Sequence, residues 1–297
     1  MKITNKKGLP QSFVDMAQEE YFEKENEYRV TALLAPIRET ILKKRYKDQI
    51  EVDVSDMVWL LFGKAVHNVL ENHQEADHEL KEERIKVPFQ NTIISGQFDL
   101  YNSNEKKITD YKTASVWKFI YKDFEDWKHQ TLIYCWLMNQ IGFDANKGEI
   151  VAFLKDHSKT ESERKKDYPQ EPVQTVEFEF TDDDLKNIEH FIHGRVLKLK
   201  ENENTPDDQL PLCTEDERFN SGTKYAVKKG NNKRAVKVFS DHKSAQEFVE
   251  QKAKYGADKN HWIEERPGED KRCKWYCFVN EFCDYYHTCV KEGEKVV

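Results

Sequence analysis

The chain has 297 residues, enough for one large domain or two small ones. Charged residues make up 34% and hydrophobic residues 38%, but an aromatic content of 12% argues against disorder. The net charge of -8 excludes a strongly basic nucleic-acid-binding chain and still permits a local basic patch. No apolar run reaches the roughly 18–20 residues that span a bilayer, and the N-terminal residues lack a signal peptide's apolar stretch. We therefore expect a cytoplasmic protein with no membrane partner.

Two helical regions are predicted in the first quarter of the chain. Apolar residues recur at helical spacing across residues 11–46. A polar break at residues 52–56 precedes a second predicted helix, which carries Gly63 and His67. Glu71 follows His67 by four residues, so both side chains are expected on one helix face.

The next segment predicts a pair of strands. Residues 83–87 alternate between apolar and polar side chains, and residues 92–101 are typical of a strand with a glycine in its middle. A turn at residues 102–104 separates this strand from another at residues 107–113. The last two strands are expected to pair as a hairpin.

Helices and strands alternate in the remainder of the first 200 or so residues. A helix rich in aromatic residues is predicted from about residue 123 to residue 141, and residues 149–154 are typical of a buried strand. Residues 173–180 alternate and end in a helix-starting signal, from which a helix is expected to run to about residue 200.

The C-terminal third changes character. A basic hairpin is predicted over residues 224–239, with Gly-Asn-Asn at its turn, followed by a helix over residues 244–255. We interpret residues 214–262 as a basic ββα module inserted into the main domain. Residues 263–297 form a cysteine-rich end.

Two carboxylates on the predicted hairpin are candidate metal-binding and catalytic groups. Asp99 and Asp110 lie on its two strands, so their Cα atoms are expected roughly 5–10 Å apart. Paired carboxylates suit a hard divalent cation such as Mg²⁺ or Mn²⁺. Lys112 shares a strand face with Asp110, where an ammonium group can orient water or stabilise charge on a phosphate.

Further metal ligands are available close by in the sequence. His67 would add a nitrogen ligand from the preceding helix, and Glu71 could bind directly or through water. The backbone carbonyl of Tyr111, between Asp110 and Lys112, is another candidate. The set predicts a metal site that cleaves phosphodiester bonds.

These residues resemble a motif series of the PD-(D/E)XK nuclease superfamily, in its RecB-type branch. That branch combines Gly-x-x-x-His, Gly-x-x-Asp, (Asp/Glu)-x-Lys and Gln-x-x-x-Tyr. The matching residues here are Gly63 and His67, Gly96 and Asp99, Asp110 and Lys112, and Gln130 and Tyr134. A predicted helix starting at Tyr28 also resembles the branch's N-terminal helix, and the resemblance covers roughly residues 28–155.

The resemblance implies a single α/β domain over residues 1–297, with a restriction-endonuclease-like core in which helices flank a central mixed β-sheet. The roles it implies are metal binding by His67, Asp99 and Asp110, catalytic assistance by Lys112, and a position near the DNA path for Gln130 and Tyr134. The implied reaction is magnesium-dependent DNA cleavage that leaves 5′-phosphate and 3′-hydroxyl ends. Phage-type recombination exonucleases are similar in style, which implies recombination or end-processing. A single-strand annealing or recombination protein and a second copy of the chain are the implied partners.

The cysteines gather near the C-terminus. Cys273, Cys277 and Cys283 form a Cys-x3-Cys-x5-Cys run with aromatic neighbours. Several RecB-type nucleases carry three C-terminal cysteines that bind a [4Fe–4S] cluster with a distant fourth. Cys213 is the best fourth candidate here, and Cys289 is its rival. The usual spacing of the first pair is one residue shorter, and the usual fourth ligand precedes the nuclease core.

Iron–sulfur ligation is not the only use for such a cluster of thiols. Thiolates also suit zinc, to which His261 or His287 could then contribute. Unligated thiols are the third possibility.

The basic hairpin is the densest positive patch of the chain. Its turn and flanks include Lys228, Lys229, Lys233 and Arg234. One interpretation is a finger that contacts DNA phosphates and guides the strand to the metal. The other is a solvated ribbon whose charges keep it soluble.

Two other functions remain open from the sequence. The chain could be a nuclease subunit that works only in a larger assembly, such as a CRISPR-adaptation or helicase–nuclease complex. It has no Walker-type phosphate-binding run, so a motor would be a separate protein. It could also be a non-catalytic DNA-binding scaffold, although a scaffold has no need of a lysine beside the carboxylates.

Overall fold

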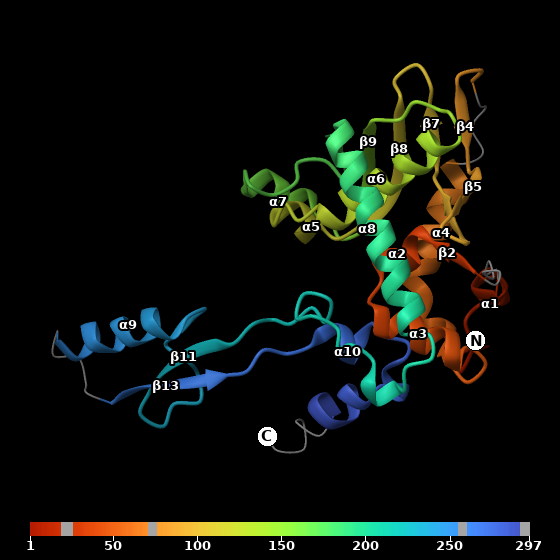
Figure 1. The fold of residues 1–297 in the computed structure, drawn as a ribbon. Coiled ribbons are helices and arrows are strands. Elements are labelled where there is room, and N and C mark those ends of the chain that lie inside the picture. Colours follow the sequence, from red (N-terminus) through yellow and green to blue (C-terminus); the bar gives the residue numbers. More distant parts are fainter. Residues whose placement is uncertain (19–25, 71–75, 255–259, 292–297) are drawn as a thin grey trace. The chain divides into compact units, whose positions relative to one another are not determined.

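The computed structural model describes residues 1–18, 26–70, 76–254 and 260–291 (Figure 1). The chain divides into two compact units, Met1–Thr205 and Pro206–Val297. The motif series lies in the first unit, and the basic module and the cysteine-rich end lie in the second. Within the described ranges, no helix is both long enough and apolar enough to cross a membrane.

A five-stranded mixed sheet forms the centre of the first unit. Its strands in spatial order are β10 (Val173–Glu179), β9 (Lys147–Leu154), β8 (Lys107–Ala114), β7 (Leu100–Asn102) and β4 (Glu79–Lys81). β8 and β9 pair in parallel, and the other neighbours pair antiparallel. The expected mixed sheet is confirmed, and its middle strand carries Asp110 and Lys112.

Helices accompany this sheet. They are α4 (Val58–Leu70), α5 (Val116–Ile120), α6 (Glu125–Gln140), α7 (Lys159–Arg164) and α8 (Asp182–Glu201). α6 packs against β8 and β9 and also against α8, so it is buried continuously from Thr131 to Met138. α8 begins with a capping box between Thr181 and Asp184, at the helix start that the sequence indicates.

The N-terminal region is less helical than its sequence indicates. The described part contains β1 (Lys2–Thr4), α1 (Gln11–Gln18), β2 (Glu27–Arg29), α2 (Val30–Leu34), α3 (Ile37–Tyr46), β3 (Glu51–Asp53) and the 3-10 helix η1 (Val54–Met57). The prediction of helix at Tyr28 was wrong, because β2 pairs in parallel with a later strand. Pro36 separates α2 from α3, since the residue before a proline disfavours helical geometry.

The predicted strand over residues 92–101 is in fact two strands in two sheets. β6 (Thr92–Gln97) joins β2 and β5 (Arg84–Phe89) in a three-stranded sheet, whereas β7 pairs with β8 in the larger one. The chain changes sheet at Phe98 and Asp99, and Phe98 is buried there. The expected hairpin is therefore shorter, and Asp99 precedes its first strand.

The second unit contains the predicted basic module with one added strand. β11 (Lys224–Lys229) lies between β12 (Lys237–Phe239) and β13 (His261–Arg266) in an antiparallel sheet, and α9 (His242–Lys254) packs on all three. β13 was not predicted from the sequence, and with it the module is ββαβ. The 3-10 helix η2 (Asp207–Gln209) precedes it, and α10 (Lys271–Trp275), the 3-10 helix η3 (Asn280–Phe282) and the π-helix η4 (Tyr286–Lys291) follow it.

Gly96 of the motif series has a packing function. A Cβ atom there would lie 2.8 Å from Leu137, 2.9 Å from Tyr134 and 2.9 Å from Val30. β6 therefore approaches α6 and α2 this closely only with glycine at this position.

Replacing Gly96 with alanine is expected to lower the free energy of unfolding by about 1–3 kcal/mol, because the added methyl overpacks three neighbouring side chains. Urea denaturation followed by circular dichroism measures the change. Gly194→Ala on α8 is the matched control, since nothing lies within 4 Å of its added methyl. That variant should gain up to about 1 kcal/mol from helix propensity. Equal stability of the two variants would contradict the packing explanation.

Candidate active site

Asp110 and Lys112 form the centre of the site on β8. Lys112 Nζ lies 2.5 Å from Asp110 Oδ2, as their shared strand face predicts. Asp110 is only 3% exposed. Burial raises the pKa of the Asp110 carboxyl; the Lys112 charge opposes this shift, and the Asp99 charge adds to it. A carboxylate buried this deeply is stable as an anion only beside a cation or hydrogen-bond donors.

Asp99 is held against the same strand. Its Oδ2 atom accepts a hydrogen bond of 2.5 Å from the Tyr111 backbone N–H. Its Oδ1 atom lies 3.2 Å from His67 Nδ1. The break between β6 and β7 makes this possible, because Asp99 stands outside both strands and its carboxylate connects β8 with α4.

His67 enters the site from α4. The hydrogen bond with Asp99 raises the pKa of His67, against the effect of its burial. The protonated imidazole is therefore favoured up to a higher pH in the metal-free protein. Since a metal ligand must lose this proton, metal affinity at His67 should increase as the pH rises through that pKa.

Glu82 completes the group of possible metal ligands and was not predicted from the sequence. One ligand atom each from His67, Glu82 and Asp99 lies within 4.8 Å of the others. Glu82 lies between β4 and β5 with a φ of 50°, and its N–H donates to the Asp99 carbonyl. Gln97 Nε2 donates to Glu82 Oε2 at 2.9 Å and so orients the carboxylate. Because Glu82 stands among other charged residues with no motif around it, only the tertiary structure reveals it.

The residues present fit a divalent cation. An imidazole together with carboxylates is a suitable donor set for magnesium or manganese. Asp110 Oδ2 is buried and has no hydrogen-bond partner of good geometry within the described structure, although the Lys112 charge is close. A buried acceptor oxygen without a hydrogen-bond partner of good geometry is one that a bound cation would satisfy. Glu71, the other predicted ligand, lies outside the described residues.

Gln130 and Tyr134 of the motif series both lie on α6 and are hydrogen-bonded to each other. Gln130 Nε2 donates a hydrogen bond of 2.9 Å to the Tyr134 hydroxyl. Tyr134 is only 4% exposed, and burial raises its pKa, with the charge of Asp110 acting in the same direction. The buried Tyr134 side chain thus offers little surface to a DNA strand, whereas Gln130 remains partly exposed.

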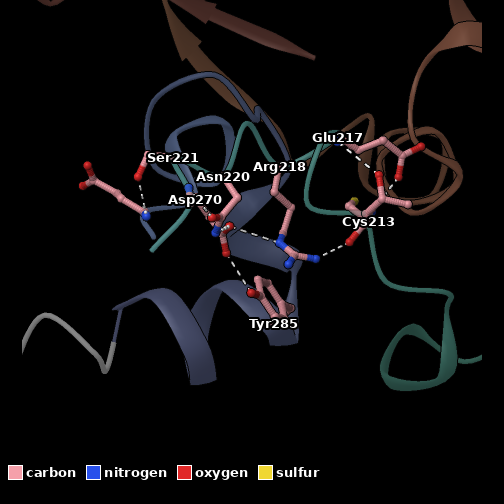
Figure 2. Close-up of polar contacts among 10 residues, drawn as sticks. Cys213, Glu217, Arg218, Asn220, Ser221, Asp270 and Tyr285 are labelled. Carbon is pink, nitrogen blue, oxygen red and sulfur yellow. Dashed lines mark hydrogen bonds and ion pairs between the residues drawn. The ribbon is translucent and has the colours of Figure 1, made fainter. Parts of the chain in front are cut away.

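In the second unit, a polar cluster joins the segment before the basic module to the segment after it (Figure 2). Arg218 Nε lies 3.2 Å from Asp270 Oδ1, and Arg218 also donates to the Cys213 carbonyl. Asn220 and Tyr285 donate to the same Asp270 carboxylate at 2.6 and 2.7 Å. Burial acts to raise the pKa of Asp270, but these three partners outweigh it and hold the pKa below its usual range.

This polar cluster connects the Cys213 carbonyl, through Arg218, to Asp270, which shortly precedes the C-terminal cysteine run. Among the described residues, no three cysteines lie close enough together to hold a metal ion as the structure stands. Asn280 Nδ2 donates to the Cys273 carbonyl, and the Cys283 N–H donates to the Asn280 carbonyl. Burial, with the charges of Asp270 and Cys283, raises the pKa of the Cys273 thiol to about 11. All six cysteines are described, and none forms a disulfide. Cys213, Cys273, Cys277 and Cys283 are partly buried, whereas the rival Cys289 is exposed.

The basic hairpin presents only part of its predicted charge to solvent. Lys228 Nζ lies 2.6 Å from Glu264 on β13 and 5.4 Å from the centre of the Trp262 ring, so its charge is already paired. Lys229, Lys233 and Arg234 are exposed at the turn.

No protein-family model matches the sequence, and no curated protein does. Among solved structures, a phage-related exonuclease from Haemophilus somnus is similar over 64% of this chain and 78% of its own, with 15% identity and a TM-score of 0.30. An alkaline exonuclease from Laribacter hongkongensis is similar over 60% of this chain and 90% of its own, with 11% identity and a TM-score of 0.37. At this distance they assign no residue, and function is inferred below from the side chains of the site.

Glu82→Gln is expected to weaken Mn²⁺ binding by about 10-fold or more, because it removes one anionic ligand while keeping the side-chain size. Isothermal titration calorimetry with manganese chloride measures the affinity. Glu83→Gln, an exposed carboxylate one residue further on, is the matched control and should bind as the wild type does. If both variants bind equally, Glu82 is not a ligand.

Proposed function

We propose that this protein is a metal-dependent deoxyribonuclease that hydrolyses DNA phosphodiester bonds. The observation that supports the proposal most strongly is the buried Asp110 carboxylate, paired with Lys112 and next to the group of His67, Glu82 and Asp99. Structural ion pairs are seldom this deeply buried beside three further ionisable ligands. The combination suits phosphoryl chemistry, in which negative charge must be both bound and neutralised.

The residues of the site have separable roles in this reaction. Asp99, Asp110, His67 and Glu82 would hold Mg²⁺ or Mn²⁺, with the Tyr111 backbone carbonyl and Glu71 as further proposed ligands. When bound, the cation supplies Lewis-acid stabilisation of the scissile phosphate and lowers the pKa of water.

Lys112 is placed to act beside the scissile phosphate. Its ammonium group can orient the attacking water or neutralise charge that develops on the phosphate oxygens. Asp110 holds this ammonium at 2.5 Å, which fixes its position on the strand. Asp99, through its bond to the Tyr111 N–H, fixes the backbone between the two residues.

We propose that the enzyme is an exonuclease that acts in recombination or DNA end-processing, on the motif resemblance to RecB-type and phage recombination nucleases. A single-strand annealing or recombination protein is the proposed partner, and self-association is proposed with it. A nuclease that is active only inside a CRISPR-adaptation or helicase–nuclease assembly is the second candidate, and a non-catalytic scaffold is the third.

The remaining DNA contacts are proposed at two places. Lys229, Lys233 and Arg234 at the hairpin turn have the exposure that phosphate contacts require, and Lys228 contributes to the local field although Glu264 pairs with it. Gln130, which is partly exposed on α6, is proposed near the DNA path, with Tyr134 positioning it through their hydrogen bond.

Asp110→Asn and Lys112→Ala are each expected to reduce metal-dependent cleavage of end-labelled DNA by about 100-fold or more, because each removes charge that the transition state requires. Linear and circular duplexes are compared with Mg²⁺ and Mn²⁺, and sparing of the circle identifies an exonuclease. Lys106→Ala, whose lysine pairs with Asp144 at the surface near the start of β8, is the matched control and should cleave normally.

Cleavage that persists in both active-site variants would show that the activity belongs elsewhere or to a contaminant. If the wild type binds Mn²⁺ but cuts no DNA, the partner-dependent nuclease becomes the preferred function. If it neither binds Mn²⁺ nor cuts, the scaffold is preferred.

The cysteines of the second unit are proposed to bind a [4Fe–4S] cluster, with zinc as the alternative. Cys213, Cys273, Cys277 and Cys283 supply thiolates, the donor type that both groups prefer. The Arg218–Asp270 pair supports the proposal, because it fixes Cys213 next to the residues that lead into the cysteine run. A bound metal or cluster is expected to lower the raised pKa of the Cys273 thiol, because the thiolate is the form that acts as a ligand.

Protein purified without oxygen is expected to contain iron and sulfide in equal amounts and to absorb broadly in the visible range. Cys277→Ser should lose both, whereas Cys135→Ser, whose cysteine is buried in α6, is the control that should retain them. Zinc without sulfide would support the alternative, and protein with neither would contradict both.

A further inference from the structure

Two exposed aromatic rings lie on α5 and at its C-terminal cap, directly after β8. The Trp117 and Tyr121 side chains are 55% and 72% exposed, and their rings stack with centroids 5.6 Å apart and an interplanar angle of 25°. Four residues apart, they share one helix face. On the other side of α5, Val116 and Phe119 pack into a buried cluster with Trp127.

Hydrogen bonds at the start of α5 fix the position of the helix that carries the Trp117–Tyr121 pair. Ser115 caps α5 by accepting from the Trp117 N–H at 3.3 Å. Asp156, just after β9, accepts from the Val116 N–H at 2.8 Å and from the Ser115 hydroxyl at 2.6 Å. α5 is therefore fastened to the ends of both parallel strands, and its rings do not depend on a loop for their position.

The pair also lies close to the proposed scissile phosphate. Trp117 follows Lys112 by five residues, so their Cα atoms are at most about 18 Å apart even if the chain between them were fully extended. That distance corresponds to a few nucleotides of one DNA strand at about 3.4 Å each.

A third exposed ring and a positive charge flank the same strand end. The Trp59 side chain at the start of α4 is 60% exposed, and Lys155 Nζ lies 4.5 Å from the centre of its ring. The Lys155 N–H donates to the Ala114 carbonyl at the end of β8. Lys155 thus joins Trp59 to the strand end from which α5 starts.

We infer that Trp117 and Tyr121 form a stacking platform for unpaired bases of the DNA strand that enters the site, with Trp59 and Lys155 beside it. The inference rests on the proposed nuclease function and specifies its substrate: a single strand, or a duplex end that has frayed. In an intact duplex each base face is covered by its neighbours, whereas an unpaired base offers a π-face to an exposed ring. Because the Trp117 and Tyr121 rings are nearly parallel, a base can stack on the exposed face of this pair.

Binding to strands with and without bases tests the platform. The probes are a fluorescein-labelled oligothymidylate and an abasic sugar–phosphate strand of the same length, both measured by anisotropy without divalent metal. The variant with both Trp117→Ala and Tyr121→Ala is expected to lose about 5- to 150-fold in affinity for the oligothymidylate, since stacking contributes this much per base. Its affinity for the abasic strand should be unchanged.

Two comparisons guard against a structural effect. Phe191→Ala removes an exposed aromatic ring from α8 in the same unit and should leave both affinities unchanged. The variant with Trp117→Phe and Tyr121→Phe should restore most of the preference for bases. Equal losses on both strands, or no loss on either, would overturn the inference.

Cleavage by the same variants separates this inference from the proposed function. If wild-type protein cuts DNA and the Trp117→Ala, Tyr121→Ala variant loses rate on single strands but not at internal nicks of a duplex, both are supported. If the wild type cuts and the variant matches it on every substrate, the platform fails and the nuclease stands. If the wild type cuts nothing but keeps its base-dependent binding, the nuclease proposal fails while the stacking surface stands as a DNA-binding one.

Discussion

Burial of the Asp110 carboxylate is the constraint on which the first unit depends. A charge almost fully removed from water is costly unless a cation stands beside it, and Lys112 is the nearest one on the strand. The need to stabilise this buried charge connects the middle strand of the sheet with the neighbouring segments. Asp99 accepts a hydrogen bond from the backbone between Asp110 and Lys112, and His67 on α4 lies within 3.2 Å of Asp99.

The change of sheet at Phe98 and Asp99 brings the Asp99 carboxylate into the group of possible metal ligands. Had the chain continued as one strand, Asp99 would have been limited to one face of a ladder. Instead β6 ends in one sheet and β7 begins in another, and the Asp99 carbonyl and carboxylate bind different partners. Glu82 enters by the same route, because its N–H donates to that carbonyl while its side chain joins the ligand group.

In the second unit, an ion pair joins the two ends of the ββαβ module, which are far apart in sequence. Arg218 and Asp270 are separated by about fifty residues of β11, β12, α9 and β13, and their ion pair, with Asn220 and Tyr285, joins the two ends. An ion pair in partial burial needs all its partners to be stable, which explains the number of hydrogen bonds on one carboxylate. The cysteines lie on the segments that this closure brings together.

The sequence by itself determined what periodicity and spacing can encode: the alternating strands of the mixed sheet, the helix that carries His67, and the face shared by Asp110 and Lys112. These are local properties, since a strand repeats every two residues and a helix every 3.6. Only the tertiary structure decided that residues 92–101 divide between two sheets, that residues 261–266 form a third strand of the module, and that Glu82 joins the site. Each of these depends on contacts between segments distant in sequence, and no local pattern distinguishes a glutamate in a turn from its charged neighbours.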